Sequence, residues 1–140
     1  MPSLRNYDLF ISHAWRYSDD YYNLERLLKT APYFQFRNYS VPTHDPLVDP
    51  GTRIGQQRLE ELLDRQIRPI QCLLVIAGMY AAHRFWIDKE IGFAQSYNKP
   101  IIGIAPWGQE RLPQFVQFSA HAFVRWNTDS IVGAIRQWAL

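Results

Sequence analysis

The length of 140 residues is that of a single domain, since domains commonly run at about 100–150 residues, and we expect one domain over residues 1–140. With 47% hydrophobic and 20% charged residues the composition is ordinary for a globular protein, which excludes a disordered or low-complexity chain. The net charge of +2 is too near balance to favour nucleic acid as a partner, and no apolar run approaches the ~18 residues of a membrane span.

The first half of the chain predicts two strands and a helix. Met1–Asn6 has no hydrophobic signal region, so we expect a cytoplasmic protein. Tyr7–Ser12 has the pattern of a buried strand, and a helix is expected between a start at Ser18 and a stop at Pro32. Phe36–Val41 is a second strand candidate, and the proline-rich stretch from Ser40 to Thr52 predicts a long loop.

The second half predicts three more strands and their helices. The run Ile70–Ala77 is apolar on both faces, as central parallel strands are. The other expected elements are a helix capped by Thr52 and ended by Pro69, a helix over about 83–97, a strand over Pro100–Ala105, a short helix near Pro113, a strand over His121–Val124, and a final helix capped by Asn127.

Five short strands alternating with helices predict a doubly wound, parallel α/β sheet. Right-handed crossovers favour the flavodoxin-like strand order 2-1-3-4-5 in a chain of this size. The switch point then lies between the first and third strands, where ligands of such sheets bind. We therefore expect a ligand to meet Ser12 and His13 at one strand end and the segment 77–80 at the other.

Several kinds of α/β site are excluded by the residues at these strand ends. Ser12–Trp15 contains no glycine, so neither a P-loop nor a dinucleotide fingerprint is present. The acidic cluster of a phospho-acceptor receiver and the Gly-x-Ser-x-Gly elbow of serine hydrolases are missing as well. Four scattered histidines and the lone Cys72 do not predict a metal site or a disulfide, and Cys72 is expected to be a packing residue.

The helix that follows the strongest strand carries one acid on an aromatic strip. Glu90 shares a face with Trp86, Phe93 and Tyr97, beside an apolar row of Ile87, Ile91 and Ala94 that is expected to face the sheet. Asp88 and Lys89 are expected on the outward side. A carboxylate among aromatic walls exerts a stronger field on a cation beside it, which makes Glu90 a candidate catalytic residue.

A purely structural interpretation of the same residues stays open. Most helical glutamates lie at the surface, so Glu90 can instead be solvated or paired with Arg84 or Lys89. A lone histidine at a strand end, such as His13, can likewise be a hydrogen-bonded structural residue.

Three separated segments resemble TIR domains, specifically the TIR-like proteins of bacterial Thoeris anti-phage defence. Tyr7–His13 resembles the first box of that family, an aromatic-Asp-x-Phe-Ile-Ser-aromatic strand. Tyr80–Ile91 resembles its Tyr…Trp-x-x-x-Glu element, with Trp86 and Glu90 at the expected spacing. Lys99–Ile104 resembles the strand that follows.

The resemblance implies an enzyme that cleaves the nicotinamide–ribose bond of NAD⁺, with NAD⁺ as substrate and no further cofactor. Glu90 occupies the place of the essential glutamate of catalytic members. Tyr80 and Trp86 are then expected to stack on nicotinamide, and Ser12 and His13 to contact ribose or phosphate. The product, ADP-ribose or a cyclic or conjugated form of it, would signal to an effector protein, with self-association on activation.

Two other functions remain open from the sequence. Many TIR domains are non-catalytic interaction domains, and a flavodoxin-like binder of some other nucleotide derivative is the third possibility. Release of nicotinamide from NAD⁺ separates the enzyme from the interaction domain, and a neighbouring gene for a nucleotide-sensing effector would argue against the third.

Overall fold

The structure, a computed structural model, describes residues 5–12, 19–40, 53–76, 84–105 and 120–140. In chain order the elements are β1 (Asn6–Ile11), α1 (Asp19–Thr30), β2 (Gln35–Asn38), α2 (Arg53–Ile67), β3 (Cys72–Ile76), α4 (Arg84–Ser96), β4 (Ile101–Ala105), β5 (Ala122–Arg125) and α6 (Thr128–Trp138).

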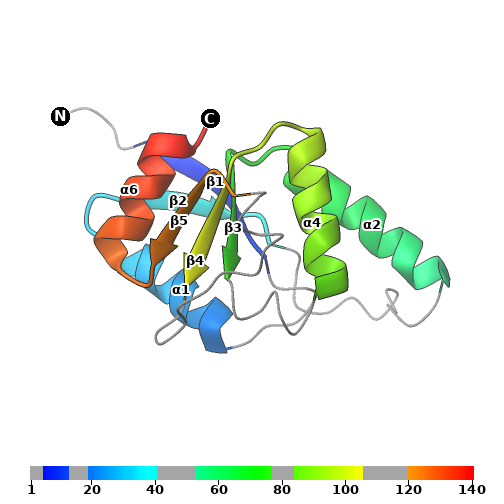
Figure 1. The fold of residues 1–140 in the computed structure, drawn as a ribbon, viewed down its shortest axis with the longest axis horizontal. Coiled ribbons are helices and arrows are strands. Elements are labelled where there is room, and N and C mark those ends of the chain that lie inside the picture. Colours follow the sequence, from blue (N-terminus) through cyan, green and yellow to red (C-terminus); the bar gives the residue numbers. More distant parts are fainter. Residues whose placement is uncertain (1–4, 13–18, 41–52, 77–83, 106–119) are drawn as a thin grey trace.

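The strands form one parallel sheet in the order β2-β1-β3-β4-β5, which confirms the predicted fold class (Figure 1). The chain reverses its direction of winding between β1 and β3, where Leu9 pairs with Cys72 and Ile11 with Leu74. The carboxyl ends of β1 and β3 therefore lie side by side, and this edge of the sheet is where a ligand is expected.

Helices cover both faces of the sheet, with α1 and α6 on one side and α2 and α4 on the other (Figure 1). Every residue of β3 and β4 is buried, because both faces of these central strands are covered. In α4 the side chains that are fully buried against the sheet include Ile87, Ile91 and Ala94, as the apolar row predicts.

The helix ends follow the capping chemistry of the sequence. The side chain of Asn127 accepts a hydrogen bond from the Ser130 N–H (3.1 Å) and so caps α6, as predicted. Asp19 and Asp20 lie in the first turn of α1, where negative charge is favourable. The predicted start at Ser18, the loop over 41–52 and the helix near Pro113 lie outside the described residues.

The second strand is shorter than predicted, since β2 ends at Asn38 rather than continuing to Val41. The Tyr39 N–H still donates to the Leu9 carbonyl of β1 at 2.7 Å, whereas the backbone of Ile11, two residues further along β1, is bonded by the side chain of Ser40. Within the described part of the chain, none of the helices combines the length and the apolar character needed to cross a membrane.

Candidate functional site

A serine and a glutamate meet at the carboxyl end of β1. Ser12 directly follows this strand, and its N–H donates to the Leu74 carbonyl of β3 at 2.8 Å. The Ser12 hydroxyl donates a hydrogen bond to the carboxylate of Glu90 on α4. Ser12 is 0% and Glu90 1% exposed, and among the described residues they are the buried polar or charged side chains.

The burial of Glu90 follows from its place on α4. The residue lies at the edge of the helix face that presents Ile87 and Ile91 to the sheet, so its side chain enters the core beside the end of β1. An ionisable group is costly to bury unless it is hydrogen-bonded, and such groups are concentrated at functional sites. Burial and the bond from Ser12 make Glu90 the candidate reactive group of this site.

The structural alternative of a solvated Glu90 is wrong, because Glu90 is buried. Its neighbour Lys89 bonds Glu60 of α2 at 2.5 Å, and the side chain of Arg84, the other expected partner of Glu90, lies outside the described part of the structure. Asp88 and Lys89 are half-buried rather than simply outward-facing. The reason is that α2 packs against this side of α4, which the sequence pattern of α4 alone does not reveal.

Tyr97, the last residue of the predicted aromatic strip, follows the end of α4 and contacts α2. The Tyr97 hydroxyl donates to the Asp64 carboxylate of α2 and accepts from Arg68 Nε at 3.3 Å. Tyr97 therefore joins α4 to α2 rather than enclosing Glu90, from which it is two helical turns away. The pKa of Asp64 lies below its usual range, chiefly because of this hydrogen bond and then because of the charge of Arg68.

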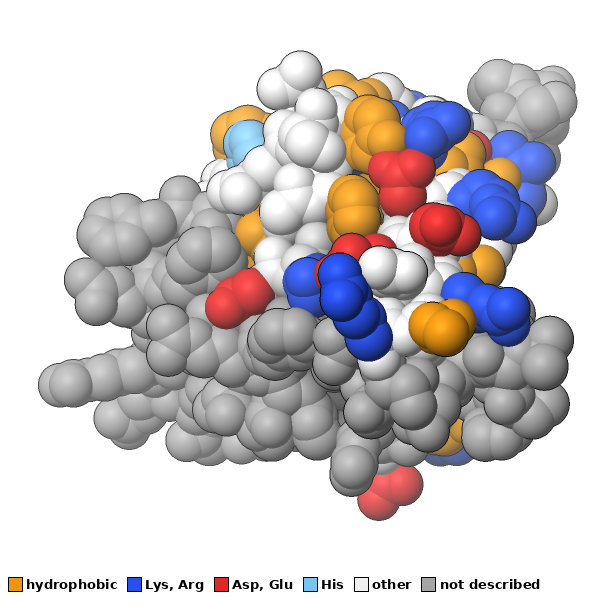
Figure 2. Space-filling view, turned by 90° about the vertical axis from the view of Figure 1, so that its right-hand side faces the viewer, with side chains coloured by type: hydrophobic (Ala, Val, Ile, Leu, Met, Phe, Trp, Pro, Cys, Tyr) orange, Lys and Arg blue, Asp and Glu red, His pale blue; other side chains and the backbone are white. Residues whose placement is uncertain are grey.

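Phe93 also lies toward α2. It lines a shallow surface groove of about 340 Å³ together with Glu60, Lys89, Gly92 and Ser96. Figure 2 shows this side of the molecule, where acidic and basic side chains lie next to one another with hydrophobic side chains scattered among them. The groove has no buried reactive group of its own and does not compete with Glu90 as a catalytic site.

Ser40 is a site neighbour that the sequence analysis missed. Its hydroxyl accepts a hydrogen bond from the Ile11 N–H (2.9 Å) and donates one to the Ile11 carbonyl (3.1 Å). Asn38 holds Ser40 in turn, because its side-chain oxygen accepts from the Ser40 N–H at 2.9 Å. A serine after a strand is a weak signal, and only the position of β2 beside β1 reveals these contacts.

The other predicted site residues lie partly or wholly outside the described part of the chain. His13 and Tyr80 belong to the residues that the structure does not describe, and Trp86 is described only as a helical residue of α4, one turn before Glu90. Of the predicted set, the structure thus brings together Ser12 and Glu90. In the described ranges, no group of three or more His, Cys, Asp and Glu side chains has an arrangement suited to a metal ion.

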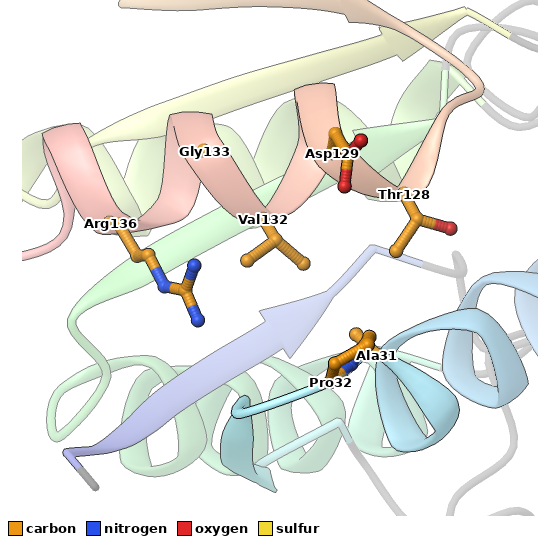
Figure 3. A pocket seen from close by; sticks show the side chains of 7 residues that line it. All are labelled: Ala31, Pro32, Thr128, Asp129, Val132, Gly133 and Arg136. Carbon is orange, nitrogen blue, oxygen red and sulfur yellow. The ribbon is translucent and has the colours of Figure 1, made fainter.

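A separate hollow of about 280 Å³ lies between the end of α1 and α6, on the opposite side of the sheet (Figure 3). The Arg136 guanidinium at its edge donates to the Tyr33 carbonyl (2.8 Å) and lies 5.9 Å from the centre of the Phe34 ring. These contacts give Arg136 a structural role. The hollow's other lining residues are Ala31, Pro32, Thr128, Asp129, Val132 and Gly133.

Comparison with known proteins places this geometry in a family. The family model described as the TIR-like domain of Thoeris protein ThsB matches residues 10–111 of the chain. The matched segment begins within β1, contains both Ser12 and Glu90, and extends beyond β4. No curated protein matches the chain.

Proposed function

The chain belongs to the TIR-like domain family of the Thoeris protein ThsB, and we propose that it is an enzyme of anti-phage defence that cleaves the nicotinamide–ribose bond of NAD⁺. The observation that carries the proposal is the buried Glu90 carboxylate, which accepts the Ser12 hydroxyl hydrogen bond at the carboxyl edge of the sheet. Ligands of doubly wound sheets bind at this edge, next to the switch point.

The chemistry of the bond suits a single fixed carboxylate. When the bond between the ribose C1′ and the nicotinamide nitrogen breaks, the electron pair leaves with nicotinamide, which departs neutral and needs no acid. The ribose gains oxocarbenium character, as in glycoside hydrolysis. The negative charge of Glu90, held in a water-poor site, stabilises that developing positive charge.

Attack on C1′ completes the reaction. A water oxygen forms the new bond and releases one proton to the solvent, which gives ADP-ribose. Attack by another nucleophilic group of the nucleotide, with loss of one proton to the solvent where that group carries one, gives a cyclic isomer. In either case the product carries the signal to an effector protein, and the protein self-associates on activation. We propose that the reaction takes place in the cytoplasm.

The role of Ser12 toward substrate is narrowed by its bond to Glu90. A hydroxyl has one proton, and that of Ser12 is donated to Glu90. Toward a substrate, Ser12 then offers acceptor lone pairs, to which a ribose hydroxyl can donate and a phosphate group cannot. We therefore assign Ser12 to the ribose, and keep His13 for ribose or phosphate and Tyr80 and Trp86 for stacking on nicotinamide.

The test is the release of nicotinamide from NAD⁺ by the purified chain, followed by chromatography. Glu90→Gln keeps the shape of the side chain and removes its charge, so we expect turnover to fall by about 100-fold or more. Glu60→Gln is the matched control, because Glu60 is a partly exposed glutamate of α2 that pairs with Lys89, and it retains wild-type turnover.

Equal turnover by the wild type and Glu90→Gln contradicts the proposal. If the wild type releases no nicotinamide even in extracts of phage-infected cells, the non-catalytic interaction domain becomes the better description.

A further inference from the structure

We propose that Ser40 is a positioning residue of the active site, which fixes the end of β1 and through it the Ser12–Glu90 pair; this role rests on the proposed function of Glu90. Ser40 follows β2, whereas Ser12 follows β1, and Ser40 is not one of the residues expected to contact the substrate. It acts on the reaction through other residues.

Ser40 takes the place of a strand partner beside Ile11. Strand β2 ends at Asn38, and the Tyr39 N–H that follows it donates to the Leu9 carbonyl at 2.7 Å, so β2 itself does not extend alongside Ile11. The Ser40 hydroxyl bonds both backbone groups of Ile11, accepting from its N–H at 2.9 Å and donating to its carbonyl at 3.1 Å. Because Ile11 is fully buried, water cannot readily replace these two bonds.

Ile11 immediately precedes Ser12 in the chain. On the other side of β1, the Ser12 N–H donates to the Leu74 carbonyl of β3 at 2.8 Å. The Ile11–Ser12 segment is thus held from both neighbouring strands, by Ser40 on one side and by Leu74 on the other. The direction of the Ser12 hydroxyl, and with it the hydrogen bond to Glu90, depends on this segment.

Ser40 is itself held by a polar cluster around Asn38. The side-chain oxygen of Asn38 accepts from the Ser40 N–H at 2.9 Å. Its amide nitrogen donates to the Tyr21 hydroxyl (2.8 Å) and to Glu25 Oε2 (2.7 Å), both on α1. Burial raises the pKa of Tyr21, so the phenol stays protonated and neutral at physiological pH. Hydrogen bonds therefore run from α1 through β2 and β1 to the carboxylate on α4.

A group that acts through position should affect the chemical step more than substrate binding. A displacement of about 1 Å at a catalytic group can lower a rate by about 100-fold. The hydrogen bonds of Ser40 in the described part of the chain go to the backbone of Ile11 and to Asn38, and not to Ser12 or Glu90, so its loss should leave binding of NAD⁺ nearly unchanged. The expected signature is a lower kcat at a similar KM.

The experiment measures nicotinamide release from NAD⁺ by the full chain carrying Ser40→Ala, Ser40→Thr or Ser96→Ala. Ser40→Ala should lower kcat by about 10- to 100-fold with KM within about twofold of the wild type. Ser40→Thr keeps the hydroxyl and should restore most of the rate. Ser96→Ala is the matched control, since Ser96 bonds a backbone carbonyl at the far end of α4 (2.8 Å).

A second variant separates positioning from general damage to the fold. If Ser40 acts through Ser12, then adding Ser40→Ala to a chain that already carries Ser12→Ala should lower kcat little further. Amide hydrogen exchange without NAD⁺ gives a readout independent of turnover. The Ile11 amide should exchange faster in Ser40→Ala, whereas the amide of Ile104 in β4 should keep its protection.

The outcomes distinguish this inference from the function on which it rests. Wild-type kcat in Ser40→Ala, with turnover still abolished by Glu90→Gln, overturns the role of Ser40 and leaves the enzyme in place. A loss of kcat from Ser40→Ala that is as large in the Ser12→Ala background as in the wild type overturns it as well. Equal turnover by the wild type and Glu90→Gln instead overturns the proposed function.

Discussion

The hydroxyl of Ser12 donates to the carboxylate of Glu90 inside the molecule, although 78 residues separate the two in sequence. The topology explains the meeting, because β1 and β3 are neighbours in the sheet and α4 is the next described helix after β3. The carboxyl end of β1 thus lies beside α4. Since a buried carboxylate is costly for the fold, this contact links stability directly to the proposed catalytic site.

A double-mutant cycle measures the energetic coupling between Ser12 and Glu90. Ser12→Ala removes a buried donor to a carboxylate, so we expect the free energy of unfolding to fall by about 2 kcal/mol. Because the side chains are in contact, the effects of Ser12→Ala and Glu90→Ala should differ from additivity by about 1 kcal/mol. Urea unfolding of the two single variants and the double variant measures this difference.

The control for this cycle replaces Ser12→Ala by Ser96→Ala, which lies on the same helix as Glu90 without a bond to it. Its effect should add to that of Glu90→Ala within about 0.5 kcal/mol. Strict additivity of Ser12→Ala and Glu90→Ala would contradict the hydrogen bond.

A pH-dependent contribution to stability is expected where α2 meets α4. The pKa of Asp64 is lowered from its ordinary value of 3.8, first by the Tyr97 hydroxyl and then by Arg68. A lowered native pKa means that the carboxylate stabilises the fold above pH 3.8 and that this contribution is lost as pH falls through the lowered value. Tyr97→Phe removes the largest cause, so the pKa of Asp64 should rise toward 3.8.

Carbon-detected NMR titration of the Asp64 carboxyl measures this shift, and unfolding at several pH values gives the matching change in stability. The destabilisation by Tyr97→Phe should be largest near neutral pH and shrink below pH 3.8. Tyr33→Phe is the control, because Tyr33 is 79% exposed and far from Asp64 in the fold. A pKa of Asp64 that is the same in Tyr97→Phe as in the wild type would show that Arg68 alone sets it.

Much of the fold is predictable because the central strands can be recognised from their own sequence pattern. The run from Cys72 to Ile76 is apolar on both faces, which is the pattern of a strand covered on both sides. The end of β2 was predicted wrongly, at Val41 instead of Asn38, because hydrophobicity alone set that boundary. The Ser40 side chain that takes over from the ladder bonds a residue 29 positions away, and no local pattern contains that contact.

The candidate site is predictable only to the extent that one helix can reveal it. The position of Glu90 on α4, after the central strand, is readable from spacing. The partners of Tyr97 cannot be read from spacing. Asp64 lies on α2 and Arg68 directly follows it, and the packing of α2 against α4 is part of the tertiary structure. Helical periodicity therefore grouped Tyr97 with Glu90, whereas the structure assigns it to the contact between the helices.

Helix α6 contains a glycine whose replacement should stabilise the protein. Gly133 is exposed, and a Cβ added there would meet nothing within 4 Å. Glycine in a helix interior is less favourable than alanine by about 0.5–1 kcal/mol, so Gly133→Ala should raise the free energy of unfolding by about that amount. Urea denaturation measures the gain, and Ala134→Gly, at the buried neighbour, should give a loss. A lower stability of Gly133→Ala would mean that the hollow beside α6 needs the bare backbone.

The single thiol provides a probe of how the central sheet opens. Cys72 is fully buried at the start of β3, and this burial raises the pKa of its thiol. Since only the thiolate reacts with alkylating reagents, the native protein should be inert to iodoacetamide at pH 8, and labelling should become rapid above the urea midpoint. Mass spectrometry follows the reaction, and Cys72→Ala gives the background. If the free energy of opening obtained from the labelling rate equals the free energy of global unfolding, β3 opens only when the whole sheet unfolds. Fast labelling of the native protein would contradict the buried position of Cys72.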